Sequence, residues 1–178
     1  GETTVTANQA ASSAGTDLTI DANALESDDL FLSGDADIAV DELGATLDAN
    51  TLSGELDIDT KLNSTLTATL GTGDTTVSGA VDSDLTLEAG NLVNDGNVDA
   101  ETSAELTLDG DGQMTVNAIT SDIDAGAYDG ELTINTGGVS GHGDNPAMDI
   151  ITGGYSEGAA GESSAVVVNV EEDEVRPL

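Results

Sequence analysis

The chain has 178 residues, enough for one domain, with 36 acidic residues against 2 basic ones and a formal net charge of −34. Such a charge excludes nucleic acid and membrane insertion, because nucleic acid and anionic lipid require a basic surface; it favours bound cations, high-salt adaptation or plain solubility. Aromatic residues make up 2% and cysteine is absent, so we expect a thin aliphatic core without disulfides.

The N-terminal segment begins the β pattern. The chain starts at Gly1 without a charged or apolar leader, from which we expect a mature product or an excised fragment. No apolar run approaches the roughly 18 residues of a membrane span. Glu2–Ala7 alternates weakly, as does an edge strand that lacks a partner.

A 76-residue duplication occupies the middle of the chain. Shifting the sequence by 76 residues aligns Leu30–Thr60 with Leu106–Thr136 without a gap, and 12 of the 31 pairs are identical. A weaker copy begins near Leu70, and a truncated copy, Thr19–Leu25, leads the series. We therefore expect a structural unit of roughly 38 residues, used three times after a partial start.

Each unit has the two-residue period of short β-strands. Apolar residues alternate in runs such as Ile38/Val40 and Leu56/Ile58, with Gly, Asp, Asn and Ser between the runs. The chain is therefore predicted to be all-β. The ungapped repeat favours a parallel β-solenoid or β-roll over residues 1–136, because stacked coils place equivalent residues at equivalent heights. An antiparallel β-sandwich is the alternative.

The sequence leaves the repeat register near Gly137. A glycine-rich stretch is followed by the most apolar run of the chain, which predicts a strand covered on both faces. We assign residues 137–178 to a loop and a terminal strand of the same domain. This strand is either an internal cap, or adds to the N-terminal region of a neighbouring subunit and so propagates a homopolymer. The predicted assembly residues are Ala165, Val166, Val167, Val168 and Val170.

Acidic turns are the candidate ligand sites. Several turns place Asp beside Gly, which lets the backbone carbonyls turn inward, and calcium takes roughly six to eight oxygen ligands. Asp-Gly is also good turn chemistry without any ion. The predicted calcium ligands are Asp35, Asp37, Asp74, Asp109, Asp111 and Asp144.

Two acidic positions recur within the duplication. Asp48 matches Asp124, and Glu55 matches Glu131. As ligands, these carboxylates would form a ladder that bridges adjacent coils. As structural residues, the Asp would cap a turn and the Glu would be a solvated strand residue. Both interpretations remain open from the sequence alone.

The glycine- and aspartate-containing turns carry a family resemblance. The run Ser64–Val81 and the segment SGHGDN resemble the calcium-binding repeat proteins of the RTX class, and LTLDGDGQMTVNAI is similar to degenerate repeats of bacterial surface-layer and adhesin proteins of that class. No stretch matches the full nonapeptide pattern. The resemblance implies calcium binding and a cell-surface location. The residues nearest to the pattern are Gly71, Gly73, Asp74 and Val77.

Catalysis has little support in the sequence. His142 lies in a glycine-rich stretch, and the paired carboxylates of a glycosidase would lack aromatic platforms for sugar. We therefore expect a non-enzyme: a secreted, calcium-stabilised structural protein, bacterial or halophilic archaeal, that self-assembles into an extracellular filament, surface layer or matrix. The alternatives are a monomeric adhesin module that binds a surface ligand such as a polysaccharide, and a polysaccharide-active β-helix enzyme.

Overall fold

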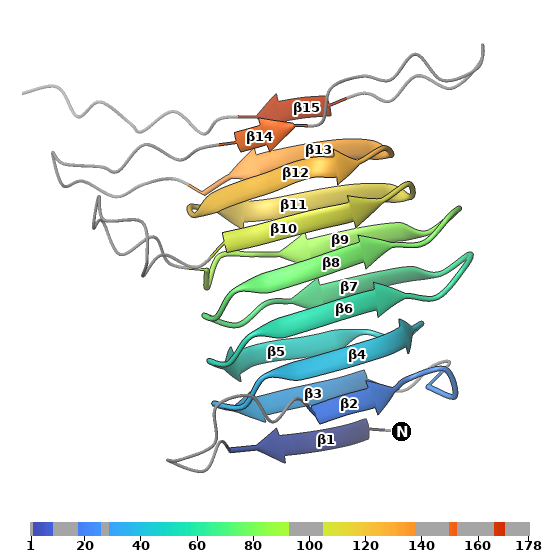
Figure 1. Ribbon diagram of the computed structural model, residues 1–178, viewed down its shortest axis with the longest axis vertical. Coiled ribbons are helices and arrows are strands. Elements are labelled where there is room, and N and C mark those ends of the chain that lie inside the picture. Colours follow the sequence, from blue (N-terminus) through green and yellow to red (C-terminus); the bar gives the residue numbers. More distant parts are fainter. Residues whose placement is uncertain are drawn as a thin grey trace, which may run out of the picture.

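The computed structural model describes residues 2–8, 18–25, 29–92, 105–137, 150–152 and 166–169. Within these ranges the chain forms 15 β-strands, β1 to β15, and no helix, and the strands alternate between two stacked parallel sheets (Figure 1). The predicted all-β parallel solenoid is therefore confirmed, and the antiparallel sandwich is excluded because the strands pair in parallel. No helix long and apolar enough to cross a membrane occurs in the described ranges.

The odd-numbered strands form sheet A and the even-numbered strands form sheet B. One coil consists of one strand from each sheet. The strands of sheet A are β1 (Glu2–Ala7), β3 (Asp29–Gly34), β5 (Leu47–Leu52), β7 (Thr65–Thr69), β9 (Asp84–Glu88), β11 (Gln113–Ile119), β13 (Glu131–Thr136) and β15 (Val166–Asn169). Those of sheet B are β2 (Leu18–Asp21), β4 (Ile38–Leu43), β6 (Leu56–Thr60), β8 (Thr75–Gly79), β10 (Glu105–Gly110), β12 (Asp122–Tyr128) and β14 (Ile150–Thr152).

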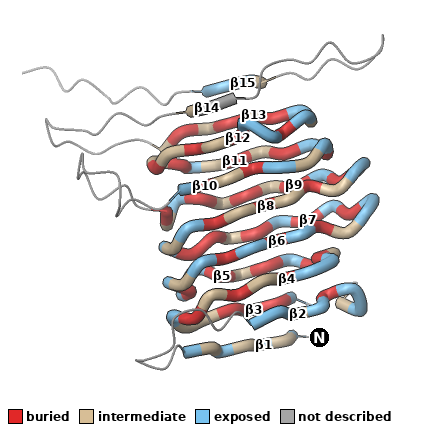
Figure 2. The backbone as a smooth tube through the Cα atoms, in the orientation of Figure 1, coloured by how far each residue is buried: buried red, intermediate tan, exposed pale blue. Residues whose placement is uncertain are grey.

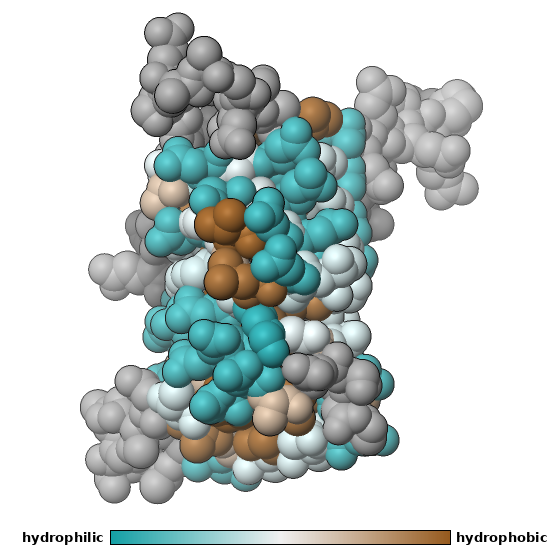
Figure 3. Space-filling model, turned by 90° about the vertical axis from the view of Figure 1, so that its right-hand side faces the viewer, coloured by the Kyte–Doolittle hydropathy of each residue, from teal (hydrophilic) through white to brown (hydrophobic). Residues whose placement is uncertain are grey.

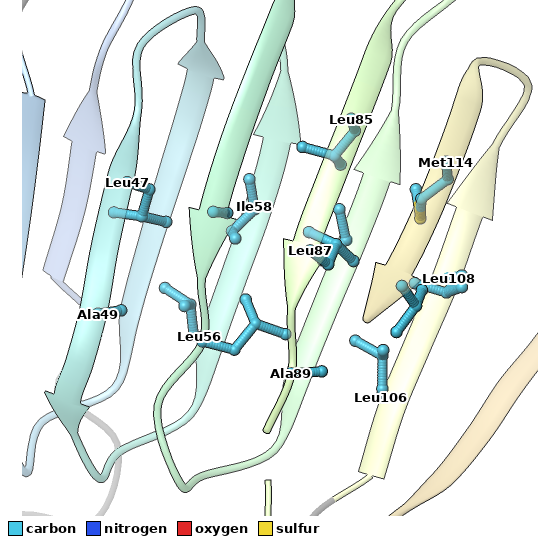
Figure 4. Packing of buried hydrophobic residues seen from close by; sticks show 14 of the residues in the cluster. Leu47, Ala49, Leu56, Ile58, Leu85, Leu87, Ala89, Leu106, Leu108 and Met114 are labelled. Atoms are coloured by element: carbon cyan, nitrogen blue, oxygen red, sulfur yellow. The ribbon is translucent and has the colours of Figure 1, made fainter. Parts of the chain in front are cut away.

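The core is a thin layer of aliphatic side chains between the two sheets. Alternate residues of each strand point inward, as the two-residue period predicts, and Figure 4 shows Leu85 and Leu87 of sheet A in the same layer as Leu106 and Leu108 of sheet B. All four are fully buried or nearly so. Buried stretches run through the middle strands, whereas β1 and β15 have no buried residue (Figure 2).

The duplication maps each strand onto the opposite sheet. A shift of 76 residues carries β3 to β10 and the next three strands to β11, β12 and β13. The inward residues at matched positions are buried in both copies, for example Leu32 with Leu108 and Ile58 with Ile134. Because the copies are seven strands apart, an odd number, they are related by a half-turn about the solenoid axis. The two copies therefore follow the same strand path with the same inward residues buried, as expected, but they lie on opposite sheets and do not stack directly on one another.

The repeated phrase around Asp48 and Asp124 encodes a β-bulge. In β5 and β12 the buried residues are spaced by two and then by three, and the register with the preceding strand shifts by one residue there. The Asp48 carboxylate accepts a hydrogen bond of 3.1 Å from the Asn50 amide, and Asp124 accepts one of 2.8 Å from the Gly126 amide. Each Asp thus provides an acceptor for a backbone amide within the bulged part of the ladder.

The duplication also preserves two tight corners of the coil at which the backbone has a positive φ angle. Gly34 and Gly110, 76 residues apart, have positive φ angles of 119° and 99°. A Cβ at Gly34 would lie 1.7 Å from the Ala7 carbonyl oxygen, and one at Gly110 would lie 2.0 Å from the Gly79 carbonyl oxygen. These corners require glycine because the backbone of the preceding coil occupies the space of a side chain.

We predict that Gly110→Ala destabilises the protein by about 2 kcal/mol or more, because it combines a strained φ with a backbone clash. The control is Gly90→Ala, whose Cβ would meet its nearest neighbour, the Ala118 Cβ, at an ordinary 3.4 Å. Denaturant unfolding monitored by circular dichroism measures both variants. Equal stability of the two variants would contradict the proposed close approach of successive coils.

Candidate functional site

A column of carboxylates runs along the edge where the chain enters sheet B. The residue before each of the strands β4, β6 and β8 is acidic, and so is the first residue of β10 and of β12. The registers of these strands place the five residues on successive coils, roughly 4.8 Å apart. We call this set the acidic column: Asp37, Glu55, Asp74, Glu105 and Asp122.

Two members of the acidic column bind the backbone of the next coil. The Asp37 carboxylate accepts a hydrogen bond of 3.0 Å from the Glu55 amide, and Asp74 accepts one of 3.0 Å from the Glu105 amide. The turn chemistry of these aspartates therefore explains part of their presence without an ion. The remaining cost is repulsion between like charges on successive coils, which salt and bound cations reduce.

A hollow of about 200 Å³ lies beside the lower part of the column, on the outer face of sheet B. Thr19, Ile38 and Ala39 form part of its wall. Three carboxylates complete the lining: Asp37, Glu55 and Asp57.

The predicted calcium ligands do not converge on one site. Asp37 and Asp74 share the acidic column but are separated by the coil of Glu55. Asp35 lies in the turn after β3, at the same edge of the solenoid as the acidic column. Asp109 and Asp111 lie at the opposite edge, where β10 ends. Asp144 falls outside the described residues. Among the described residues, no three acidic or histidine side chains are grouped as a metal site requires.

The duplicated acidic residues do not form a ladder between adjacent coils. Asp48 lies in sheet A and Asp124 in sheet B. Glu55 precedes β6 of sheet B, whereas Glu131 begins β13 of sheet A. The half-turn between the copies separates each pair. The two aspartates stabilise bulges, and both glutamates are exposed.

Sequence reasoning missed the acidic column because its members are unevenly spaced in the chain. The segment between β9 and β10 is longer than the other connections, so the regular spacing of the acidic residues is interrupted before Glu105. The strand registers are needed to place Glu105 and Asp122 in the same column. The sequence pattern that could have revealed the column is the acidic residue that stands directly before, or at the start of, each strand of sheet B.

The outer face of sheet A carries two regular columns of polar side chains. One is a threonine column on four successive coils, set by the strand registers. The other is an amide column in which Asn117 donates to Glu88 at 2.9 Å, Asn135 donates to Asn117 at 2.8 Å and Asn169 donates to Asn135 at 2.7 Å. The threonine column consists of Thr67, Thr86, Thr115 and Thr133.

Tyr128 closes the core at the end of β12, near the carboxylates of Asp111 and Glu131. It occupies the position of Leu52 in the other copy, and its hydroxyl donates a 2.7 Å hydrogen bond to the Gly112 carbonyl. Burial raises the pKa of the Tyr128 hydroxyl well above its usual range, and the carboxylates of Asp111 and Glu131 raise it further. The fold therefore stabilises the neutral hydroxyl.

The two ends of the solenoid expose inward-facing apolar side chains. Leu18 in β2 aligns with the buried Ile38, yet it is 38% exposed, and Val168 in β15 aligns with the buried Ile134, yet it is 42% exposed. β1 and β15 are the edge strands of sheet A. The prediction of an N-terminal edge strand is confirmed.

The terminal apolar run pairs within its own chain. Val166–Asn169 forms β15, which pairs in parallel with β13. One edge of the run is therefore paired within the chain, as the internal-cap alternative expects. No described strand pairs with its other edge. The expected cover on both faces is wrong: Val167, on the outer face, is 48% exposed, because β15 is the last described strand of its sheet. Ala165 and Val170 lie outside the described residues.

One lateral surface is also apolar. Leu62 and Val81 occupy corresponding positions in the successive turns after β6 and β8, and they are 62% and 50% exposed. Figure 3 shows hydrophobic patches (brown) surrounded by hydrophilic surface on this side of the solenoid. The other exposed large apolar residues among those described lie on the terminal strands: Leu18, Val167 and Val168.

No family model, curated protein or solved structure matches the chain. The functional argument therefore depends on the acidic column, the polar face of sheet A and the two open ends.

We predict that Tyr128→Phe lowers the free energy of unfolding by about 1 kcal/mol near neutral pH, because the Gly112 carbonyl loses its hydroxyl donor. The wild-type contribution is complete below the usual tyrosine pKa of about 10 and is lost as the pH rises toward the raised folded-state pKa. The difference between the proteins should therefore shrink in alkaline solution. Unfolding curves from neutral to alkaline pH test this, and parallel pH profiles would contradict it.

Proposed function

We propose that this protein is a secreted, non-catalytic structural protein that assembles end to end into an extracellular filament, surface layer or matrix. The observation that carries the proposal is the pair of open solenoid ends, with Leu18 exposed at one end and Val168 at the other. A parallel strand ladder has free donors and acceptors at each end, and natural monomers usually cap or charge such edges. A second copy supplies both the missing strand and the missing apolar contacts.

The chemistry of the terminal strands supports assembly between identical copies. The terminal strand β2 has the sequence LTID, which closely matches LTLD in the internal strand β10. β2 therefore has the inward apolar side chains of a strand that is covered on both sides. At the other end, the amide column continues onto β15 through Asn169, so β15 has the register of an internal strand. Both ends thus resemble interior coils and can accept a further coil.

Calcium is proposed as the stabilising cation. The supporting feature is the acidic column, since a divalent ion between carboxylates of successive coils offsets repulsion more effectively than a monovalent ion. The charge of −34 gives every assembled copy the same need for counter-ions. The absence of cysteine suits an extracellular protein that folds without oxidative enzymes, in a bacterium or a halophilic archaeon.

A monomeric adhesin module is the second candidate. The outer face of sheet A favours it, because the threonine and amide columns present hydroxyl and amide groups at regular spacing, as a repetitive surface polysaccharide would require. This candidate leaves the open ends without a role. Assembly therefore accounts for more of the molecule.

We predict that the wild-type protein forms particles whose mass grows with protein concentration in calcium, whereas Leu18→Asp and Val168→Asp remain monomeric. Each substitution places a charge on an open end, where a stacked copy would bury it. Light scattering after size-exclusion chromatography gives the mass, and circular dichroism checks folding.

The matched control is Leu62→Asp, which places the same charge on the lateral surface and should assemble like the wild type. A wild-type protein that stays monomeric at every concentration, with and without calcium, would rule out the structural proposal and leave the adhesin candidate. Loss of assembly in Leu62→Asp would move the contact to the side of the solenoid.

For the cation, we predict that Asp74→Asn raises stability at low ionic strength by up to about 1 kcal/mol and reduces the stabilisation by calcium. The amide retains the acceptor for the Glu105 amide and removes repulsion within the acidic column. The control is Asp84→Asn, because the neighbours of Asp84 in sheet A are the uncharged Thr65 and Gln113. Thermal melting in calcium, magnesium and sodium at equal ionic strength measures the effect. Equal rescue by sodium would point to high-salt adaptation instead.

A further inference from the structure

One tripeptide of the sequence matches the acceptor pattern for N-linked glycosylation, in which Asn is followed two residues later by Ser or Thr. It reads Asn-Ser-Thr and covers residues 63–65, and no other asparagine of the chain has Ser or Thr two residues after it. The structure places this tripeptide where β6 turns into β7, at the edge of the solenoid where the strands of sheet B end (Figure 1). The same turn contains the exposed Leu62 of the lateral surface.

The turn presents the two residues that the acceptor pattern requires and buries the one between them. Asn63 and Thr65 are exposed. Ser64 is buried, and its hydroxyl donates a 2.6 Å hydrogen bond to the Lys61 carbonyl. Ser64 thus stabilises the turn, while the carboxamide that would carry a sugar and the hydroxyl that completes the acceptor pattern lie at the surface.

The backbone of the turn explains Asn63 only in part. Its φ angle is 57°, in the left-handed region that asparagine adopts more readily than most residues. The next turn along the same edge, after β8, has Asp82 at the corresponding position with the same φ angle of 57°. In that turn, Ser83 repeats the hydrogen bond of Ser64 and donates to the Ala80 carbonyl at 2.6 Å. The turn therefore accepts Asp as well as Asn, and its geometry does not require an amide nitrogen.

The third residue of the tripeptide also differs between the two turns. Thr65 begins β7 and pairs with Asp84, the first residue of β9. Both side chains are exposed, so the fold does not require a hydroxyl at this position. The turn conformation and the core thus leave the combination of an amide and a hydroxyl at residues 63 and 65 without a structural reason.

We infer that Asn63 is a site of N-linked glycosylation, with a lipid-linked oligosaccharide as the sugar donor. In the transfer, the Asn63 Nδ2 atom bonds to the anomeric carbon of the first sugar, and the bond from that carbon to the phosphate oxygen of the lipid carrier breaks. A base of the transferase takes the proton from Nδ2, and the lipid pyrophosphate leaves with the electron pair of the broken bond. The inference rests on the extracellular location in the proposed function, because oligosaccharyltransferases act on exported chains.

The glycan would lie on the lateral surface, next to Leu62 in the same turn and near Val81 in the following turn. These side chains are 62% and 50% exposed. An N-linked glycan is bulky and hydrophilic, so it would separate this apolar pair from other copies. The modification would thus keep one side of the solenoid free of lateral contacts.

Variants of the full chain test the site in cells that export it and contain an oligosaccharyltransferase. Asn63→Asp removes the acceptor nitrogen and introduces the residue found in the next turn, and Thr65→Val removes the hydroxyl from an exposed strand position. Thr65→Ser is the matched control, because it retains the hydroxyl. The double variant Asp82→Asn/Asp84→Thr places the same tripeptide in the next turn.

Intact-mass spectrometry of the exported proteins measures the glycan, tandem mass spectrometry of their peptides locates it, and circular dichroism checks folding. We expect the added mass of one glycan in the wild type and in Thr65→Ser, and a second glycan in the double variant. Asn63→Asp and Thr65→Val should have no added mass.

An exported wild-type protein without added mass would overturn the inference, and so would added mass that persists in Asn63→Asp. Light scattering tests the proposed function separately. A glycosylated protein that stays monomeric at every concentration would overturn end-to-end assembly and leave the glycosylation site standing.

Discussion

The parallel hydrogen-bond ladder between coils is the constraint on which the rest of this structure depends. It fixes successive strands at about 4.8 Å, so every outward side chain meets the corresponding side chain of the next coil. Leucine rows make the core, amides bond to amides in the column that ends at Asn169, and carboxylates repel one another in the acidic column. The outermost described strands of each sheet therefore present an edge at which the ladder can continue.

Much of the fold could be predicted from the sequence because its causes are local. The two-residue period of runs such as Ile38/Val40 specifies strands, and the Asp-Gly turns separate them. The half-turn of the duplication could not be predicted, because it depends on whether the number of strands between the copies is odd. That number follows from where the longer connections, such as the one before β10, fall along the chain.

The candidate site was less accessible from the sequence. Asp37 and Asp74 were identified as acidic turn residues, but their common column required the register of three strands. Asp48 and Asp124 recur because each supplies an acceptor to a bulge amide, which only the backbone geometry reveals. The pKa of the Tyr128 hydroxyl is raised because the side chain is buried. The residues next to Tyr128 in the sequence do not indicate this burial.

The central claim is that the strand ladder continues from one copy into the next. Electron cryomicroscopy of the assembled protein tests it most directly, since it shows whether both sheets continue from one copy into the next. The account predicts unbroken density for two parallel sheets through each junction, with strands about 4.8 Å apart. Sheets whose density ends between copies, or copies that touch only through the sides of the solenoid, would contradict it.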